Sequence, residues 1–211
     1  MHIAIVSATN KEMIDEKALS QLPYQFSYHI HGVGLLSSTF YLTELAQSKP
    51  DLIIQIGIAG SYTSKIKIGQ VVLVSEEELG DTGAETESGF LKLNQLFTES
   101  NKMQDDMFDS FKNPFIQKFG LEQVKGLTVN TCAGRKETIQ SRIALFHADI
   151  ESMEGASLHF VCLKKNIPFL QIRGISNMVE IRDKSSWDIA LAIKNCHLSL
   201  YNIIKELSLI S

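Results

Sequence analysis

The sequence is short of cysteine and contains no long apolar run, and each shortage excludes a class of protein. Its three cysteines, Cys132, Cys162 and Cys196, are an odd number and lie far apart, without a C-x-x-C pair. A disulfide framework or a zinc ribbon is therefore not expected, and the thiols are predicted to be reduced. No apolar stretch approaches the roughly 18–20 residues that span a bilayer, so no membrane-spanning helix is expected.

Positive charge is also scarce. The formal net charge is −4, and no arginine precedes Arg135. A chain without an overall basic field is not expected to bind nucleic acid or an anionic membrane. The first residues, MHIAIVSAT, lack the basic segment that begins a secretory signal, so the predicted compartment is the cytoplasm.

What is present is the composition of a globular protein. Of the 211 residues, 44% are hydrophobic and 21% are charged, which is enough apolar content for a sizeable core. No linker rich in proline, glycine or serine divides the chain. Residues 1–211 are therefore predicted to form a single domain.

Short apolar runs alternate with stretches of helical spacing. Strands are predicted at His2–Val6, Tyr24–His31, Leu52–Ile56, Gln70–Ser75, Leu127–Thr131, Ala148–Ile150 and Phe169–Ile175. Helices are predicted at Leu35–Ser48, Asp105–Gly120, Lys136–Phe146, Met153–Lys165 and Trp187–Leu207. The polar segment Glu76–Gln104, including the acidic run Glu76–Glu78, is predicted to form solvated loops. The alternation indicates an α/β fold with a largely buried sheet.

Several predicted strands end in small or polar residues. These strand ends are Ser7–Thr9, Gly32–Gly34, Gly57–Gly60 and Ser176–Asn177. In open α/β sheets the ligand crevice lies outside the carboxyl ends of the strands. The pattern predicts a small-molecule site without naming the molecule.

Two other motifs are better explained by structure than by ligand binding. The stretch Gly32-x-Gly34-x-x-Ser37 lacks the third glycine of the dinucleotide fingerprint and follows the second strand, so a tight turn is expected. His29 and His31 share a strand face but have no third ligand nearby. We therefore expect no metal and no cofactor.

Acidic and amide side chains stand at two strand ends. Asp149, Glu151 and Glu154 gather where a strand is predicted to give way to a helix. Glu151 is suited to cap that helix, because the helix dipole favours a carboxylate at its N-terminus. Glu154 stands beside Met153, where its carboxylate can accept hydrogen bonds from vicinal hydroxyls. Asn177, after the last strand, offers both a donor and an acceptor.

Taken in order along nearly the whole chain, these motifs resemble the purine nucleoside phosphorylase/hydrolase superfamily. The resemblance is closest to its futalosine hydrolase branch and extends to its methylthioadenosine/adenosylhomocysteine nucleosidase branch. The motifs that carry it are Ile3–Val6 followed by Glu12, His31–Gly34, Gly57–Gly60, Glu151–Ala156, and Arg173–Asn177 followed by Arg182-Asp183 and Trp187-Asp188.

The resemblance implies a three-layer α/β/α sandwich with a central mixed β-sheet, forming a homo-oligomer of two or more subunits whose neighbours can complete the sites. It implies that Glu12 activates the attacking water, Met153 packs against the sugar, Glu154 binds the ribose hydroxyls and Asn177 holds the purine at N7. The further substrate contacts it implies are Ile58, Ala59, Gly60, Thr131, Cys132, Ser152, Ser176 and Arg182.

Two departures from the family's pattern narrow the substrate. Asn177 replaces an aspartate of the methylthioadenosine branch, and its NH2 can donate to N7 or to a 6-carbonyl, as a hypoxanthine nucleoside such as futalosine would require. Ile58 stands where phosphorylases have a serine or threonine, and their phosphate-binding arginines have no counterpart before Arg135. Hydrolysis is therefore favoured over phosphorolysis.

Several alternatives stay open. The chain could be a methylthioadenosine/adenosylhomocysteine nucleosidase or a purine nucleoside phosphorylase, and a non-catalytic nucleoside-binding relative would use the same cleft. The loop Asn130–Arg135 is expected to lie against the base, but no covering residue can be named. Arg135 and Arg182 are candidates for binding the benzoate carboxylate of futalosine.

Overall fold

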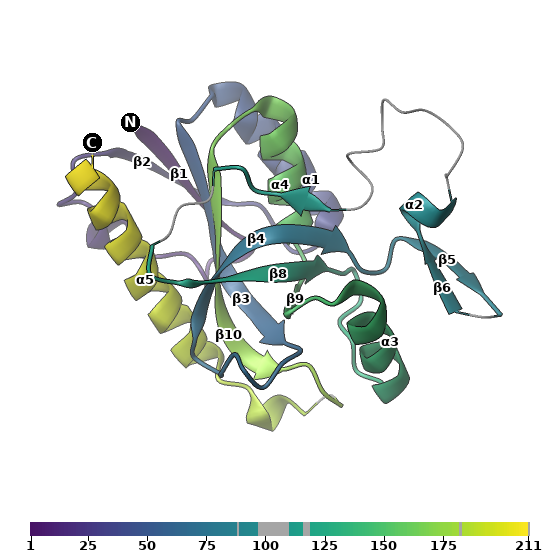
Figure 1. The fold of residues 1–211 in the computed structure, drawn as a ribbon. Coiled ribbons are helices and arrows are strands. Elements are labelled where there is room, and N and C mark those ends of the chain that lie inside the picture. Colours follow the sequence, from purple (N-terminus) through teal and green to yellow (C-terminus); the bar gives the residue numbers. More distant parts are fainter. Residues whose placement is uncertain (88, 97–109, 116–118, 182, 211) are drawn as a thin grey trace.

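A central β-sheet with helices on both faces forms the body of the molecule (Figure 1). The computed structural model describes residues 1–87, 89–96, 110–115, 119–181 and 183–210. Its strands are β1 His2–Ser7, β2 Gln25–Ile30, β3 Leu52–Ser61, β4 Val71–Leu79, β5 Gly83–Thr86, β6 Gly89–Lys92, β7 Phe111–Lys112, β8 Glu122–Thr128, β9 Ile150–Ser152 and β10 Phe169–Met178. Its α-helices are α1 Leu35–Leu45, α2 Leu93–Leu96, α3 Lys136–Phe146, α4 Gly155–Lys165 and α5 Ile189–Ile210.

The sheet is mixed, as the sequence predicts. Its strand order is β10-β4-β8-β9-β3-β1-β2, with β7 beside β4. Strand β10 also pairs in parallel with β3, so the pairings close a ring through β3, β10, β4, β8 and β9. The pairs β10–β4, β3–β9 and β4–β7 are antiparallel, and the other pairs of this sheet are parallel.

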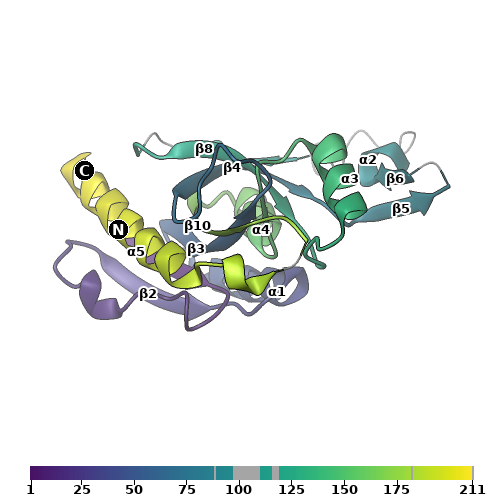
Figure 2. The same cartoon turned by 90° about the horizontal axis from the view of Figure 1, so that it is seen from below.

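The alternation of side chains along each strand produces the three layers. Ile3 and Ile5 of β1 point into a core that includes Leu200 and Ile204 of α5. The intervening Ala4 and Val6 point to the other face, where residues of α1 and α4 cover them. All four β1 side chains are fully buried, and burying a large aliphatic side chain contributes roughly 1.5–3 kcal/mol. Both views show α5 on the opposite side of the molecule from the β5–β6 hairpin (Figures 1 and 2).

The close contact between α5 and the sheet depends on a glycine. A Cβ on Gly174 of β10 would overlap the carbonyl oxygen of Ala192 in α5. The absent side chain therefore lets the helix backbone lie directly on the strand.

Three predictions of secondary structure need correction. Strand β8 occupies Glu122–Thr128, so the strand predicted at Leu127–Thr131 begins and ends earlier. Where the structure describes the predicted loops at 76–104, they instead contain the end of β4, the β5–β6 hairpin and the short helix α2; residues 88 and 97–104 lie outside the described residues. The run Glu76–Glu78 is not solvated, because Glu77 is completely buried and Glu78 is 5% exposed.

The predicted helix Asp105–Gly120 is also wrong where the structure describes it. Phe111–Lys112 form β7 and pair with Glu76 and Glu77 of β4. The Asn113 side chain then accepts a hydrogen bond from the Phe115 N–H. Pro114, between these two residues, has no N–H to donate and disfavours a helix that continues through it. Residues 105–109 and 116–118 of this prediction lie outside the described residues.

The described part of the chain lacks a membrane-spanning helix and a metal-binding cluster. There, no helix is both long and apolar enough to cross a bilayer. No three His, Cys, Asp or Glu side chains of the described residues come together in a way that could hold a metal ion.

Candidate active site

The residues predicted to act on a ligand gather around the ends of β3 and β10. Glu12 follows β1, which runs parallel to β3, and β10 runs parallel to β3 on its other side. Asn177 near the end of β10 is paired with Gly60 of β3. Glu154 follows β9, which runs back along the end of β3. Strand ends of this kind are where an α/β sheet is expected to bind a ligand.

The Glu12 carboxylate is held by contacts from its own loop and from β3. The Thr9 hydroxyl donates to Oε2 at 2.8 Å, and the Ile58 N–H donates to Oε1 at 3.3 Å. From α5, His197 Nε2 donates to the Glu12 carbonyl at 2.7 Å and fixes the backbone. The carboxylate is thus oriented before any substrate arrives.

Arg173 of β10 points toward the same place. A Cβ on Gly57 would overlap its guanidinium and lie 3.1 Å from Glu12 Oε1, so the two side chains converge over Gly57. Arg173 is only 2% exposed. Arg173 lies within a predicted motif but has no predicted role. A lone arginine inside the apolar run Phe169–Ile175 is nevertheless a signal, because a buried charge needs a partner or a function.

A chain of buried polar groups holds the guanidinium from behind. Arg173 Nη2 donates to Gln55 Oε1 at 2.5 Å, and Gln55 Nε2 donates to His31 Nε2 at 3.0 Å. His31 Nδ1 in turn donates to the Gly32 carbonyl at 2.8 Å. Burial lowers the pKa of His31 to about 4, so the imidazole is neutral and can accept from Gln55.

Glu154 lies within the electrostatic range of both groups. Its Oε1 accepts the Gly34 N–H at 2.9 Å. Burial raises the pKa of the Glu154 carboxyl, the charge of Arg173 and the Gly34 hydrogen bond lower it, and the charge of Glu12 raises it. Gly34 has φ 87°, a conformation that favours glycine. Met153 beside it is half-buried.

A third carboxyl, Glu77 of β4, lies beneath the start of α4. Its oxygens accept hydrogen bonds from Gln171 Nε2 and Thr128 Oγ1, both at 2.8 Å. Burial raises its pKa to about 7, despite these bonds and the nearby charge of Arg173. A Cβ on Gly155 would overlap Glu77 Oε1, so the residue after Glu154 must be small.

The Asn177 amide faces a different part of the site. Its Oδ1 accepts the Ser176 hydroxyl at 2.8 Å, and its Nδ2 donates to the Met178 carbonyl at 2.8 Å. A small cavity of about 50 Å³ lies beside it, lined by Gly60, Cys132, Ala133, Glu151, Asn177, Met178, Val179, Glu180, Asp183 and Trp187. Asn177, Gly60 and Cys132 are therefore brought to one space.

The other residues predicted to contact substrate lie in different environments. Ile58 contacts Glu12 through its backbone, whereas the Ala59 side chain packs in the core. Ser152 and Ser176 are buried, and Thr131 is exposed. Arg182 lies outside the described residues.

Glu151 does not cap a helix, so that prediction is wrong. It belongs to β9, where its carboxylate accepts from Ala133 N at 3.0 Å, from Arg142 Nη1 at 2.8 Å and from the Tyr62 hydroxyl. Strand β9 pairs with β8 on one side and β3 on the other, and this pairing fixes the direction of Glu151. The sequence could not show this, because the three partners belong to separate segments of the chain, between 9 and 89 residues from Glu151.

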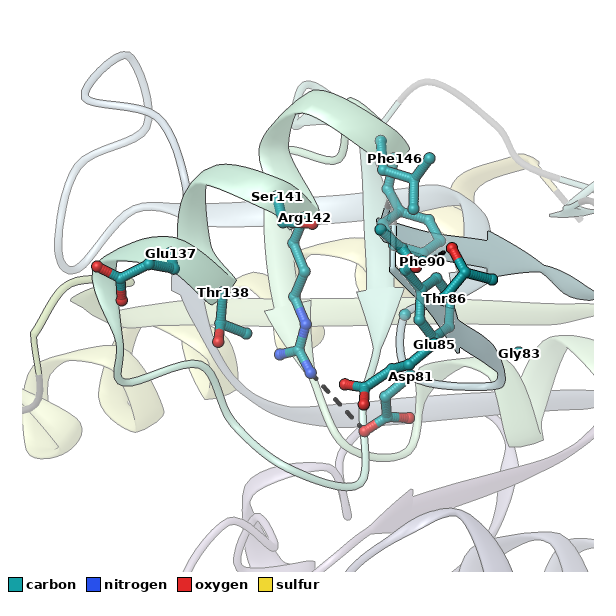
Figure 3. A pocket seen from close by; sticks show the side chains of 13 residues that line it. Asp81, Gly83, Glu85, Thr86, Phe90, Glu137, Thr138, Ser141, Arg142 and Phe146 are labelled. Atoms are coloured by element: carbon teal, nitrogen blue, oxygen red, sulfur yellow. Dashed lines mark hydrogen bonds and ion pairs between the residues drawn. The ribbon is translucent and has the colours of Figure 1, made fainter.

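A larger cavity of about 580 Å³ lies between the β5–β6 hairpin and α3 (Figure 3). None of the residues predicted to contact substrate lines it. Its walls include Asp81, Glu85, Phe90 and Arg142. It is separate from the site that contains Glu12 and Asn177.

A mixed α/β sheet that gathers carboxylates, a guanidinium and an amide beside its strand ends has the architecture of an enzyme acting on a small polar molecule. Residues 26–207 match the model of the phosphorylase superfamily, and the chain belongs to this superfamily of enzymes. The resemblance found in the sequence is thereby confirmed.

Solved structures share the fold over their full lengths. A mutant of the Helicobacter pylori futalosine hydrolase superposes with a TM-score of 0.79 at 17% identity, covering 98% of this chain and 99% of that one. A 5′-methylthioadenosine/S-adenosylhomocysteine nucleosidase from the same species has a TM-score of 0.80 at 17% identity, covering 98% of each chain. An S-adenosylhomocysteine nucleosidase from Streptococcus pyogenes, in complex with 5-methylthiotubericidin, has a TM-score of 0.80 at 19% identity, covering 98% of this chain and 97% of that one.

Proposed function

We propose that the protein hydrolyses the N-glycosidic bond of a purine nucleoside. The observation that carries the proposal is the convergence of Glu12 and Arg173 over Gly57, beside Glu154. In this proposal Glu12 and Arg173 hold the attacking water, Glu154 binds the ribose hydroxyls and Asn177 binds the base.

The proposed reaction uses these groups in one sequence. As the bond between the anomeric carbon and the purine nitrogen breaks, positive charge develops on the sugar and the bonding electrons move into the purine. Glu12 takes a proton from water, the hydroxide oxygen bonds to the anomeric carbon, and the base leaves to be protonated by solvent. A general base typically contributes roughly 10²–10⁴-fold to such a rate. An N–H donated to the purine stabilises the charge that grows on it.

The charge balance of the site favours water over phosphate. One buried guanidinium, that of Arg173, lies within the electrostatic range of the carboxyls of Glu154 and Glu77, and it converges with Glu12. A phosphate dianion would add negative charge to a region that already has an excess of carboxyl groups. Water carries no such penalty.

The contacts of Asn177 support a 6-oxopurine. Ser176 donates to Oδ1, so this hydrogen bond uses the acceptor side of the amide. The NH2 group bonds the Met178 carbonyl with one hydrogen and has a second that can donate to N7 or to a 6-carbonyl. We therefore propose futalosine, a hypoxanthine nucleoside, as substrate, which would place the enzyme in menaquinone biosynthesis. Methylthioadenosine and adenosylhomocysteine are the alternatives, because nucleosidases named for these compounds share the fold.

The decisive experiment is to incubate the protein with futalosine, inosine, methylthioadenosine and adenosylhomocysteine, with and without phosphate, and to identify the products. We expect hypoxanthine and the free sugar product from futalosine, at the same rate without phosphate. Release of adenine alone would support the second substrate class, and a sugar phosphate would contradict hydrolysis. Calorimetric binding of nucleosides without base release over hours would identify a non-catalytic relative.

Variants test the role of Glu12 directly. Glu12→Gln should fold normally and lose activity by roughly 10²-fold or more, because the amide cannot accept a proton from water. The matched control is Glu16→Gln, which alters an exposed carboxylate four residues away. Near-native turnover in Glu12→Gln would contradict the proposed role.

Binding of the benzoate carboxylate is assigned to Arg135 or Arg182, also as a proposal. Arg135 is exposed and directly precedes α3, at the end of the loop that contains Cys132. Replacing each arginine with methionine should lower the preference for futalosine over inosine. Unchanged preference would remove that residue from consideration.

Homo-oligomerisation likewise remains a proposal. Leu36 and Phe40 lie four residues apart on one side of α1 and are 88% and 72% exposed, and Val33, just before the helix, is 56% exposed. Sedimentation velocity should show a dimer or larger species, and Leu36→Gln combined with Phe40→Gln should shift it toward monomer. A monomer at all concentrations of the unmodified chain would contradict this.

A further inference from the structure

The loop Asn130–Arg135 has no helix or strand of its own, yet its backbone is tightly held. The side chains that hold it come from distant parts of the chain: Tyr62 after β3, Asp81 after β4, Arg142 of α3 and Glu151 of β9. Two members of this charged cluster, Asp81 and Arg142, also line the larger cavity shown in Figure 3.

Asp81 holds the first two residues of the loop. Its Oδ2 accepts the backbone N–H of Asn130 at 2.6 Å and that of Thr131 at 3.0 Å. Its Oδ1 accepts from the Asn130 side-chain amide at 3.2 Å. Three hydrogen bonds to one carboxylate define both the position and the direction of this backbone segment.

Arg142 and Glu151 hold the next residues. Arg142 Nη1 donates to the Thr131 carbonyl at 3.0 Å and to Glu151 Oε2 at 2.8 Å, and its Nη2 is 3.8 Å from Asp81 Oδ2 (Figure 3). Glu151 Oε1 accepts the Ala133 N–H at 3.0 Å. Four backbone polar groups between Asn130 and Ala133 are thus bonded to ionised side chains.

Because the cluster is largely buried, it stabilises one conformation of the loop over others. The side chains of Arg142 and Glu151 are 9% and 5% exposed. Leaving one of two such charges unpaired is strongly unfavourable in a buried setting, so alternative loop conformations that break these bonds are disfavoured. Tyr62 adds a hydroxyl bond to Glu151 and has its own pKa raised by burial.

The far side of the same loop faces the small cavity beside Asn177. Cys132, Ala133 and Glu151 line that cavity together with Asn177 and Gly60. With the outer backbone groups bound to the cluster, the groups presented to the cavity are fixed in place. Discrimination between a 6-oxo and a 6-amino purine requires that the groups lining the cavity with Asn177 be held in fixed positions.

We propose that Asp81, Arg142 and Glu151 are positioning residues that set the base specificity of the site through the loop Asn130–Ala133. Asp81 and Arg142 do not line the small cavity, and Glu151, which does line it, acts on the loop through its hydrogen bond to the Ala133 N–H. This inference rests on the proposed function in one respect, namely that the small cavity receives the purine.

The test compares Asp81→Asn with the wild type for inosine and adenosine. The asparagine offers one acceptor oxygen where the carboxylate has two. We expect the kcat/KM for inosine, divided by that for adenosine, to fall about tenfold, mainly through a change in KM. The kcat for the preferred nucleoside should change by less than about threefold. Glu85→Gln is the matched control, because it removes an exposed carboxylate from the larger cavity without contacting the loop.

Because Arg142→Met leaves Glu151 without its ionic partner and can unfold the chain, Arg142→Lys is the second variant. Lysine can pair with Glu151 but cannot hold the Thr131 carbonyl with a planar fork, so an intermediate loss of discrimination is expected. Lys136→Met, an exposed change on the same helix, is its control.

Hydrogen–deuterium exchange of the ligand-free protein tests whether the cluster holds the loop, independently of whether the protein is a nucleoside hydrolase. The amides of Asn130, Thr131 and Ala133 should exchange faster in Asp81→Asn than in the wild type. If these amides exchange faster while discrimination is unchanged, the cluster is purely structural and the inference is overturned. Unchanged exchange overturns it as well. If the wild type releases no base from any nucleoside, the proposed function fails, and calorimetric affinities for hypoxanthine and adenine then test the specificity role.

Discussion

Replacing Glu77 with glutamine should change how the stability of the protein depends on pH. Glu77 is completely buried, and its carboxyl oxygens accept hydrogen bonds from Thr128 and Gln171. Glutamine has nearly the same shape and can keep one acceptor in this position, but it cannot ionise. The substitution therefore removes a single titration from the interior, near Arg173 and Glu154, which both influence it.

The magnitude follows from the pKa of Glu77, which burial raises from 4.5 to about 7. Below pH 4.5 the carboxyl is protonated in both the folded and the unfolded chain, so it imposes no penalty. As the pH rises, the unfolded chain releases the proton first, and the folded chain releases it only near pH 7. Each unit of difference is worth about 1.4 kcal/mol, so the wild type loses about 2–3 kcal/mol of stability between pH 5 and pH 8 through this group.

Urea unfolding of Glu77→Gln and the wild type at several pH values between 5 and 8 measures this loss. The free energy of unfolding of the variant, relative to the wild type, should increase by about 2–3 kcal/mol across the range. A constant cost from imperfect amide pairing shifts both ends equally and does not affect the difference. Glu137→Gln, an exposed change on α3, should show no such trend. Parallel curves for Glu77→Gln and the wild type would show that the pKa of Glu77 is not raised in the folded protein.

Three further predictions concern the base site, the sheet and the thiols. Asn177→Asp should shift the preference from 6-oxo toward 6-amino nucleosides by about tenfold or more in kcat/KM, measured on inosine and adenosine. Gly174→Ala should lower the free energy of unfolding by about 1–3 kcal/mol in urea titrations, because its Cβ would overlap the backbone of α5. Ellman's reagent should modify one thiol in the native protein and three after denaturation. Cys132 is exposed, whereas burial raises the pKa of Cys162 and, to about 11, that of Cys196; hypoxanthine should slow the reaction of Cys132.

Sequence reasoning was most successful where local pattern determines structure. The apolar run at the N-terminus is strand β1, and the spacing of Lys136–Phe146 gives helix α3 with the predicted bounds. The order of strands and helices along the chain was sufficient to predict an α/β fold with a buried sheet, whereas the mixed sheet followed from the family resemblance. These features depend on the period of the side chains, which is visible in one sequence.

The errors arose where partners distant in the chain decide the structure. Glu77 reads as part of a solvated acidic run, but strand β4 continues through it and turns it inward to Gln171, 94 residues away. Phe111–Lys112 lie in a stretch of helical spacing and form a strand because β4 offers them a ladder. Glu151 resembles a helix cap until the positions of Arg142 and Tyr62 are known. None of these contacts can be recognised from the residues next to it in the sequence.

The pairing of β10 with β3 also determines when the site can form during synthesis. Arg173 bonds Gln55, 118 residues earlier in the sequence, and Asn177 pairs with Gly60 nearby. Such distant contacts form slowly, since a long loop must close before any of them is made. While the chain is still being synthesised, β3 lacks this neighbouring strand, and its apolar residues stay exposed unless another segment or a chaperone shields them. The site is thus among the last parts of the protein to exist, and a chain truncated before β10 would contain Glu12 and Glu154 without the residues that complete their arrangement.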